Sequence, residues 1–198
     1  MEDYEFHRWR DRRRTGKGIH PTAWVDKETH IGVDVEIGPF CVIDKGVEIG
    51  RGSKIGHYVW LRPGVVIGQR TQISGFGGDI RERAKIGDDC VIGSLCGITQ
   101  DAVIGNNVIM SASFFQTNKV HKGPEKYATD IKEPGGTIGD NVLIGINVTL
   151  MPGVDIGESS VIGANTVLRE SVPPGEIWYG NPAKFIKKNK DSFDLSEK

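Results

Sequence analysis

Histidine and cysteine are the side chains of this 198-residue sequence that could exchange a proton or attack a carbonyl carbon near neutral pH. The candidates are His7, His20, His30, His57, His121, Cys41, Cys90 and Cys96. His121 differs from the other histidines because it lies in a long polar stretch, near Asn118 and Tyr127. An imidazole with an ordinary pKa of about 6.5 is mostly neutral and basic at cellular pH. His121 is therefore our candidate for chemistry, and an ordinary loop histidine is the alternative.

A repeat of six residues organises most of the chain around these side chains. Pairs of isoleucine and glycine recur in phase, and a small or β-branched residue stands four positions after each aliphatic one. The pairs begin at Ile31, Ile37, Ile49, Ile55, Ile67, Ile86, Ile92, Ile104, Ile138, Ile144, Ile156 and Ile162. An α-helix does not have this period, and a simple alternating strand would not place glycine so regularly. The pattern predicts a three-sided solenoid with a short strand on each side and a turn at each corner.

Every third repeat lacks the glycine, so one full coil contains about 18 residues. Counting from Ile31 gives about seven coils, and a prism roughly 34 Å long at one strand spacing per coil. Both the aliphatic and the small residue of each repeat are expected to point inward. Cys41, Cys90 and Cys96 all occupy the small inward position, which makes them compact buried hydrophobes and argues against a nucleophilic thiol.

Two segments interrupt the period. One extra residue near Ser74–Gly78 predicts a bulge. Between residues 114 and 136 the repeat stops, and the polar sequence there predicts a loop that projects from the prism wall and carries His121. We therefore divide the chain into an arm (1–20), a β-helix domain (21–180) and a C-terminal piece (181–198).

The two ends of the chain have different characters. The arm is basic and lacks the apolar core of a signal peptide, so a flexible solvated arm is favoured over an anion-binding one. Asn181 and Pro182 are typical of a helix start, and they predict a short helix to about Lys190 that covers the open end.

Composition excludes several classes of protein. The formal net charge is −1, which argues against a nucleic-acid-binding domain, and no apolar run is long enough to span a membrane. Three cysteines without CxxC spacing favour a reducing compartment, so we expect a cytoplasmic protein.

The repeat, the histidine-bearing loop and the closing sequence Gly180-Asn-Pro-Ala-Lys184 together resemble the left-handed β-helix acyltransferases. The segment Ile138–Lys188 is especially similar to the maltose, galactoside and polysaccharide O-acetyltransferases. This resemblance implies a left-handed parallel β-helix, a homotrimer, and acetyl-CoA bound in the groove between adjacent prisms. It also implies transfer of an acetyl group to a hydroxyl or amine of a sugar or nucleotide sugar.

The resemblance assigns roles to individual residues. His121 matches the loop histidine that removes the proton of the acceptor hydroxyl, and Asn118 and Tyr127 beside it are expected to contact the acceptor. The backbone positions matching Ile146 and Ala164 contact the pantetheine arm of the coenzyme. Positions matching Lys184 and Lys187, three residues apart on one face of the predicted helix, meet its phosphates, although a solvated basic helix face would look the same.

Two other functions compete with acetyl transfer. A zinc enzyme resembling the γ-class carbonic anhydrases needs three histidines at one ion, but His30 and His57 are one and a half coils apart and should lie on different faces. A non-catalytic solenoid used for assembly would need neither the loop histidine nor the closing motif.

Overall fold

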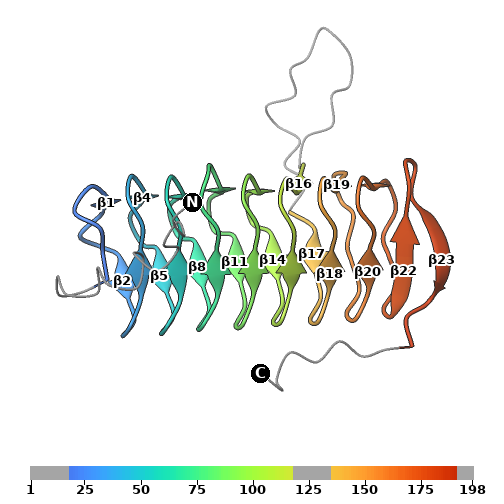
Figure 1. The fold of residues 1–198 in the computed structure, drawn as a ribbon, viewed down its shortest axis with the longest axis horizontal. Coiled ribbons are helices and arrows are strands. Elements are labelled where there is room, and N and C mark those ends of the chain that lie inside the picture. The colour runs from blue at the N-terminus through green and yellow to red at the C-terminus, as the bar shows by residue number, and fades with distance from the viewer. Residues whose placement is uncertain (1–17, 118–134, 191–198) are drawn as a thin grey trace, which may run out of the picture.

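The computed structural model describes residues 18–117 and 135–190, and within them the chain forms a parallel β-solenoid of about eight turns with no helix (Figure 1). Nearly all of its strands are two residues long, and each strand inside a sheet pairs with a neighbouring strand on either side. The sequence prediction of an all-β solenoid is confirmed. Counting from Ile31 gave one coil too few, because it left out the coil that contains Ile19 and the first strand, β1.

The strands form three sheets, which we call faces I, II and III. Face I contains β1 (Trp24–Val25), β4 (Val42–Ile43), β7 (Trp60–Leu61), β10 (Asp79–Ile80), β13 (Gly97–Ile98), β16 (Phe115–Gln116), β19 (Thr149–Leu150) and β21 (Val167–Leu168). Face II contains β2 (His30–Ile31), β5 (Glu48–Ile49), β8 (Val66–Ile67), β11 (Lys85–Ile86), β14 (Val103–Ile104) and β17 (Thr137–Ile138). Face III contains β3 (Glu36–Ile37), β6 (Lys54–Ile55), β9 (Gln72–Ile73), β12 (Val91–Ile92), β15 (Ile109–Met110), β18 (Leu143–Ile144), β20 (Val161–Ile162), β22 (Glu176–Tyr179) and β23 (Lys184–Lys188).

The core fills the inside of the prism, as the periodicity predicts. From Ile37 onward, the second residue of each two-residue strand points inward and is buried. The small residues of the turns, including all three cysteines, complete the core between these aliphatic columns. Because strands of neighbouring coils pair in register, each inward residue stacks on its counterpart one coil away.

The predicted bulge lies where β10 pairs with β7. Asp79 pairs with Trp60, an interval one residue longer than the usual coil. The extra residue falls at a turn in which Phe76 has a φ of 67°, and the Phe76 ring packs edge-on against His57, 4.5 Å between centroids. A Cβ on Gly75 would lie 2.4 Å from the His57 ring, so glycine is required there.

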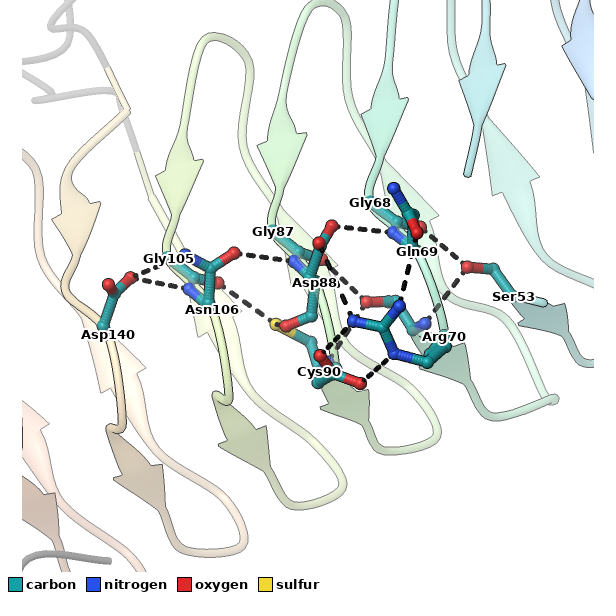
Figure 2. Close-up of polar contacts among 12 residues, drawn as sticks. Ser53, Gly68, Gln69, Arg70, Gly87, Asp88, Cys90, Gly105, Asn106 and Asp140 are labelled. Carbon is teal, nitrogen blue, oxygen red and sulfur yellow. Dashed lines mark hydrogen bonds and ion pairs between the residues drawn. The ribbon is translucent and has the colours of Figure 1, made fainter. Parts of the chain in front are cut away.

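The turns between faces II and III, which we call edge II/III, are joined by side-chain hydrogen bonds that run from coil to coil (Figure 2). The backbone N–H of Gln69 donates to Asp88, that of Asp88 to Asn106, and that of Asn106 to Asp140, at 2.8, 2.9 and 2.7 Å. The glycines that precede these turn residues leave room for the capping oxygens, since a Cβ on Gly68 would lie 2.4 Å from Asp88 Oδ1. In these three coils the outward N–H of the turn is satisfied by the protein itself.

The C-terminal helix expected after Pro182 is wrong. Residues 184–188 form β23, which runs antiparallel to β22 and closes the last coil. A strand forms here because pairing with β22 provides hydrogen-bond partners for its backbone N–H and C=O groups and brings its side chains into contact with those of β22. The Phe185 ring meets Trp178 at 6.4 Å, and Lys188 Nζ lies 2.7 Å from a carboxylate oxygen of Glu176.

Candidate active site

Ile146 and Ala164, the predicted contacts of the coenzyme arm, lie one coil apart on the edge between faces III and I, which we call edge III/I. Each follows a turn glycine, and both side chains are exposed. The Ile146 carbonyl accepts the N–H of Asn165 at 2.9 Å, and the Asn147 and Asn165 amides are joined at 2.8 Å. The predicted stacking of the two positions on one edge is therefore observed, while their role toward a coenzyme remains a prediction.

The backbone N–H groups of Ile146 and Ala164 differ from several of their counterparts on edge II/III. At Gln69, Asp88 and Asn106 the same turn position is capped by an Asp or Asn oxygen of the next coil, whereas the N–H groups of Arg51 and Asp140 on that edge have no acceptor among the described residues. On edge III/I the next coil offers no such side chain, and within residues 18–117 and 135–190 neither N–H has a protein acceptor. Two donors in line, one strand spacing or about 4.8 Å apart, thus face outward and can bind carbonyl oxygens of a ligand.

Lys184 and Lys187 are exposed on β23. They lie on the same side of the hairpin, but strand pairing places them there and not the predicted helix. Lys184 pairs with Tyr179 and Lys187 with Ile177, two residues apart on β22, because a bulge in β23 absorbs one residue. Residues two apart on a strand face the same way. Lys184 follows the last turn of edge III/I directly, so a cation stands beyond Ala164 at the C-terminal end of that edge.

His121, Asn118 and Tyr127 fall outside the described residues. The structure does describe the points where the chain leaves and rejoins the prism wall, after Gln116 and before Thr137, at the edge between faces I and II. Gln116 Nε2 donates to the Gly136 carbonyl at 2.8 Å and ties these points together. Face I, one strand wide, separates them from the edge that carries Ile146 and Ala164.

The three thiols are unsuited to nucleophilic chemistry, as their register predicts. Burial raises the pKa of Cys41 and Cys96, and it raises that of Cys90 to about 11. Each Sγ points at a carbonyl oxygen of the next coil, at 2.7 Å from Gly56 O for Cys41. A thiol whose pKa is raised and whose sulfur is enclosed gives little reactive thiolate.

Two features of the site region escaped the sequence analysis. Gln116 takes an inward position of face I, which its phase, 18 residues after Ile98, could have indicated. Edge III/I also carries a row of large apolar side chains in its N-terminal half, Phe40, Tyr58, Phe76 and Leu95, which are half-exposed or more. These four residues have φ values of 57 to 67°, a backbone conformation that bulky side chains rarely adopt.

The described residues give no support to a zinc site. No group of three or more His, Cys, Asp or Glu side chains in residues 18–117 and 135–190 could hold a metal ion. His30 lies on face II and His57 on edge III/I, which confirms that they are on different sides of the prism. In the same residues there is also no helix long and apolar enough to cross a membrane.

Comparisons with known proteins agree with this architecture. The family model of the bacterial transferase hexapeptide (six repeats) matches residues 28–63 and 135–170, and that of the hexapeptide repeat of succinyl-transferase matches residues 83–112. A probable macrolide acetyltransferase of Lysinibacillus sphaericus is 40% identical over an alignment 111 residues long, and the alignment covers 52% of this chain and 62% of that protein. The match thus spans less than two thirds of that relative's length.

Two solved structures have the same fold. The UDP-N-acetylglucosamine acyltransferase of Campylobacter jejuni superposes with a TM-score of 0.62 at 22% identity, over 90% of this chain and 79% of that one. The polysialic-acid-specific acetyltransferase NeuO superposes with a TM-score of 0.58 at 20% identity, over 90% and 92%. The fold and the repeat thus define a parallel β-solenoid built from transferase hexapeptides. The chain belongs to the hexapeptide-repeat acyltransferase family.

Proposed function

We propose that this protein is an acetyltransferase that moves the acetyl group of acetyl-CoA to a hydroxyl or amine of a sugar or nucleotide-sugar acceptor. The observation that carries the proposal is the pair of unsatisfied N–H groups at Ile146 and Ala164, on the edge that ends at Lys184. The acetyltransferase and acyltransferase names of the relatives support the reaction class.

The donor would lie along edge III/I. The pantetheine arm contains two amide carbonyls, and the N–H groups of Ile146 and Ala164 are donors of the kind that such oxygens accept. The coenzyme phosphates would then meet Lys184 and Lys187, which supply positive charge beyond the end of the edge. The thioester would point toward the N-terminal coils, away from the lysines.

Transfer would proceed in one direct displacement, with His121 as general base. The imidazole would take the proton of the acceptor hydroxyl while the oxygen attacks the thioester carbonyl carbon. Backbone N–H groups of the turns are donors suited to stabilise the oxyanion that forms. Its collapse breaks the carbon–sulfur bond, and the coenzyme thiolate leaves and is protonated. Asn118 and Tyr127 would hold the acceptor near His121.

The active form would be a homotrimer, with edge III/I at the seam between copies. Phe40, Tyr58, Phe76 and Leu95 expose apolar surface there in a row, with Phe40 and Tyr58 stacked at 5.0 Å between ring centroids. Rows of this kind on a soluble protein mark interaction surfaces. The row is continuous with the edge that carries Ile146 and Ala164, so a neighbouring copy would also wall the donor groove.

A screen of acetyl-CoA consumption tests the function. Acceptors should include sugars, amino sugars, nucleotide sugars and, because of the 40% identity to a probable macrolide acetyltransferase, a macrolide. With the best acceptor, His121→Ala should lower kcat by roughly 10²- to 10⁴-fold, the usual contribution of a general base. His30→Ala, an exposed histidine on face II, is the matched control and should keep full activity. Full activity in His121→Ala would show that His121 is not the general base.

A further inference from the structure

Gln116 is a polar residue in a column that is otherwise aliphatic. The inward residues of face I in the neighbouring coils are Ile43, Leu61, Ile80, Ile98, Leu150 and Leu168, each completely buried. Gln116 pairs with Leu150 in register and is 8% exposed, so its amide is enclosed by the wall of the prism. An aliphatic side chain would complete the column without the cost of burying an amide.

The amide joins described residues on either side of the segment 118–134. Its Nε2 donates to the carbonyl of Gly136 at 2.8 Å, across 20 positions of sequence. Its Oε1 is buried and has no hydrogen-bond partner. One N–H of the amide is thus used on a backbone carbonyl, while the buried carbonyl oxygen of the amide is unpaired, which is unfavourable for a residue that serves the core alone.

The re-entry point that Gln116 holds is tightly confined. A Cβ on Gly136 would lie 2.0 Å from the carbonyl oxygen of Val154 and 3.3 Å from Gln116 Nε2. A Cβ on Gly135 would lie 2.6 Å from the Cα of Ala102, in the coil on the other side. The returning chain is therefore pressed between two coils, and glycine is needed at both positions. Gln116 fixes the exit strand to this confined return.

We propose that Gln116 is a positioning residue, which fixes the described residues at the two ends of the segment carrying His121 and so orients that segment for transfer. The inference rests on the proposed function for its catalytic part. Its structural part, the fixing of the segment's two ends by one hydrogen bond, stands on the contacts of Gln116 alone. A core role would be served equally by the aliphatic residues that occupy the same position in the other coils.

The test compares Gln116→Met with the wild type and with Ile98→Met, which changes the same column one coil away. Methionine has a similar length and volume but cannot donate to the Gly136 carbonyl. We expect thermal unfolding of Gln116→Met to stay close to that of the wild type. Trypsin cleavage at Lys119, Lys122, Lys126 or Lys132, located by mass spectrometry, should become at least several-fold faster. The value of kcat should fall at least ten-fold, with an unchanged KM for acetyl-CoA.

The outcomes separate the two parts of the proposal. An unchanged cleavage rate in a folded Gln116→Met variant overturns the inference, and so does faster cleavage with unchanged kcat. Equal effects in Ile98→Met would assign them to general core disturbance and would also overturn it. Gln116→Leu adds a check, because leucine is the residue paired with position 116 in the next coil and cannot donate, and it should behave as Gln116→Met does. If the wild type acetylates none of the acceptors, the proposed function fails, while the cleavage comparison still decides whether Gln116 fixes the segment.

Discussion

Single residues of this protein take their chemistry from the register of the repeat. A cysteine in the inward column is a core residue, because the strand on either side of it directs the thiol toward stacked carbonyls. Burial raises the pKa of Cys90 to about 11, well above neutral pH. The same register leaves the backbone N–H of Ile146 and Ala164 facing outward.

Alkylation tests this view of the thiols. We expect iodoacetamide at pH 8 to leave both the mass and the transfer activity of the folded protein unchanged, because thiols that are buried and have raised pKa values provide almost no accessible thiolate. In denaturant, all three cysteines should be alkylated, as mass spectrometry would show. Rapid modification in the folded state with loss of activity would contradict the exclusion of a nucleophilic cysteine.

The two lysines of β23 test the donor site at the scale of single charges. Lys184→Ala and Lys187→Ala should each raise the KM for acetyl-CoA by about three- to ten-fold with little change in kcat, because each removes a cation from the expected phosphate contacts. Lys85→Ala, an exposed lysine on face II, is the control and should leave the KM unchanged. An unchanged KM in both β23 variants would show that the coenzyme phosphates do not bind at these two lysines.

At the scale of elements, the six-residue period was enough to predict the strands, the turns and the core. It did not predict the last element, strand β23. Every coil repeats the same packing, so the interior could be read from aliphatic spacing. The segment that contains Phe185 lies beyond the repeat, and local signals at Asn181 and Pro182 favoured a helix. The decisive contacts of β23 are with Trp178 and Glu176, which precede it and were not part of a local pattern. Long-range pairing therefore overrode the local preference.

The closing hairpin should make stability depend on pH. Lys188, followed by Trp178, holds the pKa of Glu176 below its usual range through hydrogen bonds of 2.7 and 2.8 Å. A carboxyl with a lowered folded pKa stabilises the fold above its unfolded pKa, about 4.3 for glutamate, and this contribution is lost as the pH falls through the lower folded value. The paired guanidinium of Arg70 lowers the pKa of Asp89 in the same sense.

Urea unfolding at a series of pH values measures this contribution. At pH 7, Glu176→Gln should be less stable than the wild type, and the difference should shrink as the pH falls below about 4.3. Glu170→Gln removes an exposed carboxylate in the preceding turn and should match the wild type throughout. A constant difference between Glu176→Gln and the wild type at all pH values would show that the charge of Glu176 is not what stabilises the hairpin.

At the scale of the whole molecule, a single prism contains the fold and the proposed donor edge, but it does not contain the proposed acceptor site. The sequence could indicate the edge on which Ile146 and Ala164 stack, because the period assigns every residue to a face or an edge. It could not indicate the acceptor, because the shape around His121 would depend on a segment outside the repeat and on a neighbouring copy. The apolar row of Phe40 and Tyr58 was also missed, since turn positions carry no periodic requirement for apolar residues.

Light scattering tests the trimer and its seam together. The wild type should have about three times the 21.7 kDa mass of one chain. The double variant Tyr58→Asp/Phe76→Asp should shift to the monomer and lose acetyl-CoA binding, because two buried carboxylates without partners would oppose association at the edge that walls the donor groove. Val103→Asp changes an apolar residue of similar exposure on face II, and it should remain a trimer. A monomeric wild type that still transfers acetyl groups would place the donor groove within one prism. A trimer that survives the double substitution would show that the apolar row does not form the seam.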